Sequence, residues 1–303
     1  MTLTMSIRDT LLVARFEVLR AIRTWRALAL IVAYVVANLG GCWIFIQAIA
    51  KLEEGIAETM GVAVTRWPGT LMEQVRQSEQ MVDIVTFFVG GGEAQARALL
   101  GQPVLAIFQL WLALLLVPFM AATTSSECVA IDVGSRAIRY EALRTGRAEL
   151  VAGRFLGQLL LTSAATAAAL LGVWVLGMTL MVAQPPVGLA LGLLWLGPRS
   201  IAWSVPFVGM GMAASQLTAS PAWARVLALV AAAGSYVVFG ICSLTTRTPW
   251  VWVADVIEPL LPQTWQLGLW DVGPSWLGSG AACAGLGAGF AAVGYLRFAA
   301  RDL

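Results

Sequence analysis

Six long stretches of this sequence contain no Asp, Glu, Lys or Arg. They cover residues 27–50, 98–126, 155–198, 200–224, 226–246 and 272–296. Each is long enough for the roughly 20 residues that a helix needs to cross about 30 Å of hydrocarbon. Only 12% of the residues are charged and 59% are apolar, whereas soluble proteins have about 25% charged residues. The pattern predicts an all-α polytopic membrane protein, because a soluble protein would need more polar surface than these stretches leave.

We expect six transmembrane helices, with breaks where proline, glycine and charge interrupt the apolar stretches. The predicted spans are 27–49, 102–122, 155–183, 198–217, 224–245 and 276–296. Because residues 187–217 are too many for one untilted span, we expect a short segment to about 196 and a break at Gly197-Pro198. In the last span, Ala281, Gly285 and Gly289 recur every four residues, which predicts a face for close helix contact.

The basic residues are unequally distributed between the two sides that this topology creates. The side that holds both termini carries thirteen of the nineteen Lys and Arg residues, in segments 1–26, 123–154, 218–225 and 297–303. The opposite side carries five basic residues and ten acidic ones. By the positive-inside rule, the first side is the cytoplasm. We therefore expect a multi-pass protein of the bacterial cytoplasmic (inner) membrane with both termini in the cytoplasm.

The N-terminal segment 1–26 combines an apolar face with basic residues. At helical spacing, one face holds Ile7, Leu11, Val18, Ile22 and Trp25, and five arginines surround it. Apolar side chains on one face and snorkelling arginines on the others are typical of a helix that lies in the membrane interface. The sequence therefore predicts an N-terminal interfacial helix before the first span.

Two outer segments are predicted to form short helices inside a single transmembrane domain that covers 1–303. The outer segment 51–101 is broken by proline and glycine, and its length is too small for a separate core. Segment 247–275 contains two apolar, Trp-rich pieces separated by Glu258-Pro259. Because these pieces are too short to span, we expect interfacial or re-entrant helices between the fifth and sixth spans.

The sequence lacks the residues on which most active sites depend. It has no His, and its four Cys are far apart, so neither a metal site nor His-based acid–base catalysis is expected. A phosphate-binding P-loop needs a lysine after glycine, but the only lysine, Lys51, follows alanine. We therefore expect no catalytic residue, no cofactor bound by this chain and no nucleic acid partner. An enzyme acting on lipids would have only Asp255, Glu258 and Asp271 at the outer interface.

Arg199 is the one charged residue within the predicted spans, apart from Arg225 at the inner end of the fifth. A charged side chain in a span is a candidate functional residue, here a contact for an anionic substrate or a lipid head group. The alternative is an arginine that snorkels to the outer interface, because a break at Pro198 would place it near the head groups. The sequence leaves both interpretations open.

The stretch "IRYEALRTGRAELVAGRF", residues 138–155, carries six charged side chains in a predicted cytoplasmic segment, 123–154. Its spacing is helical, with Ile138, Ala142 and Leu143 on one side and with Arg139, Leu143 and Arg147 on successive turns. A short helix with one apolar stripe and charge around it is suited to docking in a groove on another protein. A loop that only fixes topology is the alternative.

In this order of features, the chain resembles the membrane subunits (permeases) of ABC-2-type exporters, which belong to the ATP-binding cassette (ABC) transporters. The family has an acid after helix 2, a Gly-Ser or Gly-Thr, a short coupling helix, an Arg, and a Gly-Arg or Gly-Lys that opens helix 3. Matching residues here are Glu127 or Asp132, Gly134-Ser135, the helix near 138–144, Arg147, and Gly153-Arg154. The basic N-terminal helix, the short helices between helices 5 and 6 and the terminal "RDL" extend the resemblance over the whole chain.

The resemblance implies a transport subunit that couples ATP hydrolysis by a separate cytoplasmic ATPase to the export of an amphipathic or hydrophobic substrate. ATP and Mg would be bound by that ABC ATP-binding subunit, and the permease would form a homodimer or pair with a second permease among membrane lipids. The residues implied at the ATPase-coupling interface are Glu127, Asp132, Arg139, Tyr140, Glu141, Arg144 and Arg147. The alternative is a membrane scaffold or assembly protein that anchors a cytoplasmic partner without transport.

Overall fold

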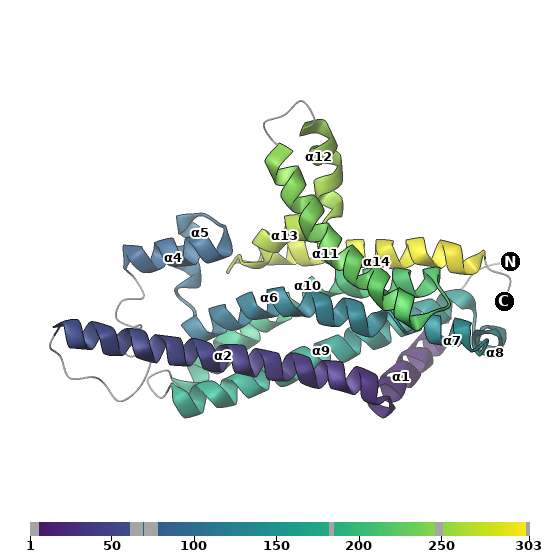
Figure 1. The fold of residues 1–303 in the computed structure, drawn as a ribbon, viewed down its shortest axis with the longest axis horizontal. Helices are drawn as coiled ribbons and strands as arrows, with labels where there is room; N and C mark the ends of the chain where they lie inside the picture. Colours follow the sequence, from purple (N-terminus) through teal and green to yellow (C-terminus); the bar gives the residue numbers. More distant parts are fainter. Residues whose placement is uncertain (1–5, 61–68, 70–77, 182–184, 246–250, 301–303) are drawn as a thin grey trace.

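The computed structural model describes residues 6–60, 69, 78–181, 185–245 and 251–300, and every regular element in these ranges is helical (Figure 1). The helices are α1 (Ile7–Arg23), α2 (Trp25–Met60), α4 (Glu79–Val89), α5 (Glu93–Leu99), α6 (Val104–Ser125), α7 (Ala130–Gly134), α8 (Ile138–Arg144), α9 (Arg147–Leu180), α10 (Pro186–Leu217), α11 (Pro221–Thr245), α12 (Val251–Ile257), the 3-10 helix η1 (Glu258–Leu260), α13 (Pro262–Leu269) and α14 (Trp276–Ala299). The predicted all-α architecture is confirmed for this part of the chain. The "RDL" at 301–303 and most of the outer segment between α2 and α4 lie outside the described residues.

Five helical segments in the described ranges are long and apolar enough to cross a membrane. They are Ala27–Gly55, Val104–Gly134, Arg147–Leu180, Pro221–Thr245 and Trp276–Ala299. These segments correspond to five of the six predicted spans. The sixth, in α10, is less apolar because it contains Arg199, two prolines and several Gly and Ser residues.

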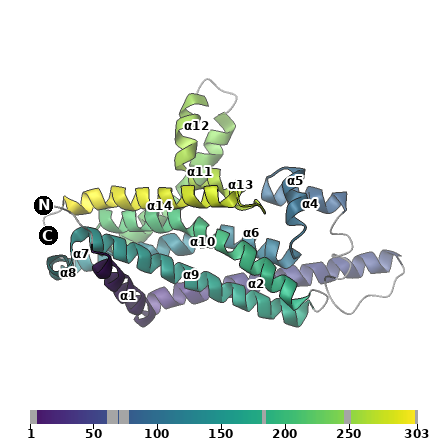
Figure 2. The same cartoon turned by 180° about the vertical axis from the view of Figure 1, so that it is seen from behind.

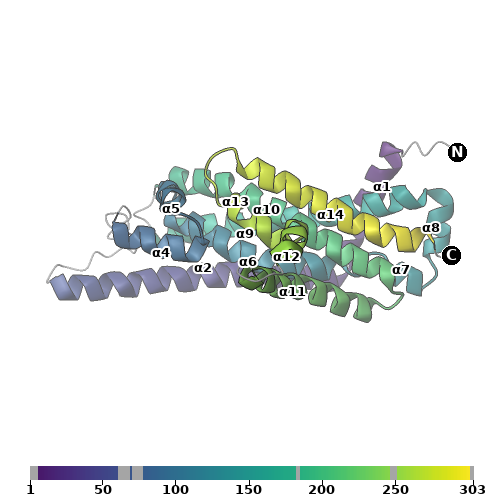
Figure 3. The ribbon, with the colours of Figure 1, turned by 90° about the horizontal axis from the view of Figure 1, so that it is seen from above.

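The long helices form one bundle. α6 and α10 lie in its middle, with α2 and α9 on one side and α14 and α11 on the other (Figures 1 and 2). α11 is inclined to the other helices, and α12 projects away from the bundle. Figure 3 shows α1, α7 and α8 at one end and α4 and α5 at the other. We call the first of these the α8 end.

α10 is a single continuous helix of 32 residues, so the predicted break at Gly197-Pro198 is wrong. Pro198 and Pro206 both lie inside it. Within a helix bundle, neighbouring helices and serine hydroxyls can satisfy the backbone groups that proline frees. Four helices, α6, α9, α11 and α14, pack around α10 and stabilise it as one continuous helix.

The close contact of α14 uses a different face from the one predicted. Gly285 and Gly289 have open space where a Cβ would stand, whereas a Cβ on Gly287 would lie 2.5 Å from the Val205 carbonyl oxygen of α10. A Cβ on Gly209 of α10 would in turn lie 2.3 Å from the Gly287 oxygen. Small residues recur on both faces of α14, so the spacing alone could not identify the packed face. The partner glycine on α10 decides it.

Two predicted helix boundaries also shift. α2 continues to Met60, which makes it 36 residues or about 54 Å long. α9 begins at Arg147, so Gly153 and Arg154 lie inside it rather than at its start. The point after which the sequence has no charged residue shows where contact with lipid can begin. A helix can start before that point if its charged residues form hydrogen bonds or ion pairs within the protein. α8, α11 and α14 begin at or near their predicted residues.

The N-terminal helix α1 is separate from α2 and packs across the start of α9. Ser6 caps α1 by accepting a hydrogen bond from the Asp9 N–H, and Thr24 ends it in an extended conformation. A Cβ on Gly153 of α9 would lie 2.6 Å from the Thr10 carbonyl oxygen. The opposite surface of α1 leaves apolar side chains exposed, including Ile7 and Phe16. This division agrees with the predicted interfacial helix.

Candidate functional site

The predicted coupling helix is present as α8 and is fixed to the bundle by its apolar side. Ile138 is 1% exposed. It packs in a hydrophobic cluster with Cys128, Val129, Leu150, Val151, Met212 and Phe298. This cluster joins α8 to the start of α9 and the last turns of α10 and α14. The apolar stripe seen in the sequence therefore faces the protein's own core.

A network of buried charges lies beside this cluster, and Asp132 of α7 is at its centre. The Asp132 carboxylate accepts two hydrogen bonds from Arg20 of α1, at 2.6 and 3.0 Å. It also lies 2.6 Å from a guanidinium nitrogen of Arg154, and Arg154 pairs in addition with Glu141 of α8. The side chains of Arg154 and Asp132 are 3% and 8% exposed. Removing one partner from a pair buried in this way costs about 3–5 kcal/mol.

Arg154 also binds the backbone at the end of α6, where its guanidinium donates to the Cys128 carbonyl. One arginine of α9 thus contacts the α6–α7 turn, α7 and α8. The sequence identified Arg154 only as part of a Gly-Arg motif. Its role as the centre of attachment was missed, because the sequence placed Arg154 in the charged segment before the third span.

The N-terminal end of α7 is fixed by α10 and α11. The Ser215 hydroxyl accepts hydrogen bonds from the Val129 and Ala130 N–H groups, at 2.8 and 2.9 Å. Such bonds satisfy donors that the first turn of a helix leaves free. Glu127 forms an ion pair with Arg225 of α11. The α7 region is therefore held in place by helices on both sides.

The outward side of the α7–α8 segment is basic and exposed. Tyr140 is 76% exposed, and Arg136, Arg139 and Arg144 are exposed as well. Arg136 joins α7 to α8 and has a positive φ of 61°. We call Arg136, Arg139, Tyr140 and Arg144 the α8 outer face. It contains three guanidinium groups and no carboxylate.

Six of the seven residues predicted at the coupling interface fall into two groups. Arg139, Tyr140 and Arg144 belong to the α8 outer face. Glu127, Asp132 and Glu141 turn inward and form ion pairs within the chain. Arg147 donates a hydrogen bond to the Ala299 carbonyl of α14 at 2.6 Å.

A second buried acid, Glu17 of α1, lies next to the network. Its carboxylate accepts a hydrogen bond from the Gln158 side-chain amide at 2.8 Å. Burial raises the pKa of the Glu17 carboxyl above its ordinary value, and the nearby charges of Arg154 and Arg20 oppose this shift only in part. Nothing in the sequence distinguished Glu17 from a surface acid on an interfacial helix, because its burial depends on the packing of α1 against α9.

Arg199 is far from this network and is 0% exposed. Its guanidinium donates to the carbonyls of Trp195 and Asp271, at 2.7 and 2.9 Å. It also lies 5.6 and 5.3 Å from the ring centroids of Trp195 and Trp276. Two carbonyls and two aromatic faces shield the charge, so Arg199 joins α10 to the turn before α14. The sequence left two interpretations open, a contact for an anionic substrate or lipid head group and an arginine at the outer interface; the structure places the side chain inside the protein.

No protein-family model matches this chain, and no characterised protein sequence matches it either. Its function is therefore inferred from its own residues and their geometry.

Proposed function

We propose that this protein is the membrane-spanning subunit of an ATP-driven ABC exporter, and that the α8 outer face docks on a separate cytoplasmic ATPase. The ATPase would bind ATP and Mg, and its movement on hydrolysis would be passed to the bundle. The cargo would be an amphipathic or hydrophobic molecule. This proposal follows the ABC-2-type resemblance of the sequence.

One observation carries the proposal: α8 is firmly attached on its inner side and exposed on its outer side. A solvated loop would have neither Ile138 in a core cluster nor Glu141 paired with a buried arginine. An exposed, basic helix face with an aromatic centre is suited to an acidic groove on a partner, because guanidinium groups and tyrosine are enriched at protein interfaces. The partner's groove is therefore expected to be acidic.

The attachment of α8 also provides a route for movement. A ligand or partner shifts an equilibrium only by as much as its binding differs between two states. α8 contacts the start of α9 through Glu141 and Arg154, so a shift of α8 would change the ends of long helices rather than a flexible loop. We propose that this end of the bundle is where ATP hydrolysis is coupled to transport.

A photo-crosslinking experiment tests the docking. Tyr140 would be replaced by photoreactive p-benzoylphenylalanine in the full chain, and native membranes would be irradiated. We expect a covalent adduct with a protein that carries a P-loop and an acidic surface groove. Phe87 of α4 provides a matched control, since it is an aromatic residue 83% exposed at the opposite end of the bundle.

Charge reversal then tests coupling. Arg144→Glu should weaken co-purification of the ATPase and reduce its stimulation, because each exposed charge contact at an interface rim chiefly affects association. Arg97→Glu, the same change at the opposite end, should have no effect. If Arg144→Glu retains the partner and its stimulated ATP hydrolysis, the docking proposal is wrong.

Transport distinguishes an exporter from a scaffold. Purified chain and partner in proteoliposomes should move an amphipathic substrate only when ATP is hydrolysed. A stable complex that hydrolyses ATP at an unstimulated rate and moves no substrate would favour the scaffold function. We propose two copies of the chain, or one copy and a second permease, in the active complex.

A further inference from the structure

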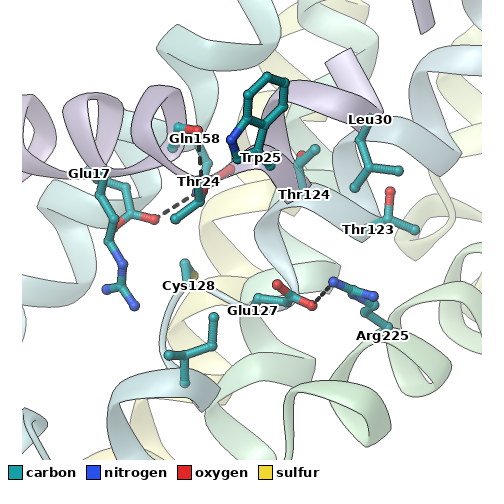
Figure 4. A pocket seen from close by; sticks show the side chains of 14 residues that line it. Glu17, Thr24, Trp25, Leu30, Thr123, Thr124, Glu127, Cys128, Gln158 and Arg225 are labelled. Carbon is teal, nitrogen blue, oxygen red and sulfur yellow. Dashed lines mark hydrogen bonds and ion pairs between the residues drawn. The ribbon is translucent and has the colours of Figure 1, made fainter. Parts of the chain in front are cut away.

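A cavity of about 400 Å³ lies between α1, α2, α6 and α11 at the α8 end of the bundle. Figure 4 shows Glu17 and Gln158 on one side of it and the Glu127–Arg225 ion pair on the other. The charge network described above lies directly behind Glu17. We call this space the α1–α11 pocket.

The positive charges around the pocket are already neutralised. Arg20 is bound by Asp132 through two hydrogen bonds, and Arg225 is paired with Glu127. Arg154, behind the pocket, is paired with Asp132 and Glu141. These three guanidinium groups are bound by Asp132, Glu127 and Glu141, and none of them forms an ion pair with Glu17.

Glu17 is poorly compensated for a buried acid. In the described part of the chain, its carboxylate has one hydrogen-bond or ion-pair partner, the Gln158 amide. The residue is only 7% exposed. A buried carboxylate that forms no ion pair is costly. A cation entering the pocket would therefore gain a strong partner.

Gln158 provides an independent sign of a missing ligand. This side chain is 3% exposed and lines the pocket. Its amide nitrogen binds Glu17, whereas its amide oxygen is buried without a hydrogen-bond partner. An unpartnered buried acceptor destabilises the folded protein. The Glu17 carboxylate and this amide oxygen are both acceptors, which suits a cation and not an anion.

Apolar side chains of α2 line another part of the pocket. Ala27 and Leu30 of α2 lie along it. Trp25, the first residue of α2, also lines it and is 84% exposed. An aromatic face attracts cations, and aliphatic side chains accommodate a hydrocarbon chain. The pocket thus offers acceptors at Glu17 and Gln158 and apolar surface along the first turns of α2.

We propose that the α1–α11 pocket binds the cationic head group of an amphipathic molecule, with the head at Glu17 and Gln158 and the apolar part along Leu30 and Trp25. The ligand class is a hydrophobic ammonium or a similar organic cation. As the cargo site of an exporter, this pocket rests on the proposed function. As a binding site, it requires no partner protein.

The binding test uses a pair of probes with the same chain and opposite charge. Tritiated octyltrimethylammonium and octyl sulfate would be dialysed to equilibrium against the full-length protein in nanodiscs of zwitterionic lipid, with empty nanodiscs subtracted. We expect saturable binding of the cation and none of the anion. Glu17→Gln should weaken cation binding about tenfold or more, because a charged hydrogen-bond partner is lost.

Two further variants complete the test. Asp9→Asn removes an acid from the same helix outside the pocket and should leave binding unchanged. Leu30→Trp fills the pocket without changing its charge and should abolish binding, which also provides a test if Glu17→Gln fails to fold. The proposal is overturned if octyl sulfate binds equally well, or if Leu30→Trp retains full affinity. Neither result depends on an ATPase, so each is independent of the docking experiments.

Discussion

Replacing Asp132 with asparagine would remove the one carboxylate that binds two guanidinium groups at the α8 end. The substitution keeps the volume of the side chain and removes its charge. Arg154, with a side chain only 3% exposed, would retain Glu141 as its single acidic partner. We expect the free energy of opening at the α8 end to fall by about 3 kcal/mol. This is the low end of the range for breaking a buried pair, because Glu141 compensates in part.

The matched variant Arg20→Gln breaks only the outer half of the same network. The Arg20 side chain is 34% exposed, so its pair with Asp132 is screened by solvent. We expect Arg20→Gln to cost about 1 kcal/mol or less. The difference in the free energy lost by the two variants measures how much burial adds to the strength of the ion pairs.

Cysteine labelling provides the assay, since Cys128 is 4% exposed and its carbonyl is bound by Arg154. Labelling by a maleimide requires local opening, and its rate follows the population of the open form. A loss of about 3 kcal/mol predicts labelling of Cys128 roughly 100-fold faster. Cys42, which is 0% exposed in the main core, serves as the internal reference by peptide mass spectrometry. Equal rates for Asp132→Asn and Arg20→Gln, or an unchanged rate at Cys128, would refute the reasoning.

Three further changes have defined outcomes. Gly153→Val places a branched side chain against the Thr10 carbonyl and should release α1 from α9, seen as faster tryptic cleavage within α1; Gly285→Val, in open space, should have no such effect. Arg136→Gly should be more stable in thermal melts than Arg136→Ala, by about 1 kcal/mol, because only glycine adopts a positive φ without strain. Burial raises the pKa of Glu17 above 4.5, so the folded protein binds more protons than the unfolded chain above that pH and its stability falls as pH rises. Glu17→Gln should flatten the decline in melting temperature as the pH rises above about 5, and an identical pH profile would contradict the burial of Glu17.

The helices of this protein could be predicted from the sequence wherever local pattern determines them. Charge-free stretches located five spans, and Ile138 with its flanking arginines located α8 to within a residue of its observed end. The break at Pro198 was predicted wrongly because proline interrupts an isolated helix. In α10, the surrounding helices stabilise the continuous form.

The inward or outward direction of polar side chains could not be predicted in the same way. Asp132 and Arg139 both lie in one charged segment, yet the first is buried by Arg20 and Arg154 and the second is exposed. Arg20 and Asp132 are 112 residues apart, so no local spacing relates them. Glu17 and Gly287 are similar cases, since a partner on a distant helix determines the burial of each.

Arg225 has a position with a geometric consequence for the α1–α11 pocket. It lies in the first turns of α11, the helix inclined to the bundle, and its ion pair with Glu127 connects that helix to the fixed α6–α7 turn. Arg225 is the α11 residue that lines the pocket. If α11 moves against the α6–α7 turn, Arg225 moves with it and the width of the pocket at this point changes, while Glu17 and Gln158 on the opposite side stay in place. The position of α11 and the access of a molecule to the pocket would then change together.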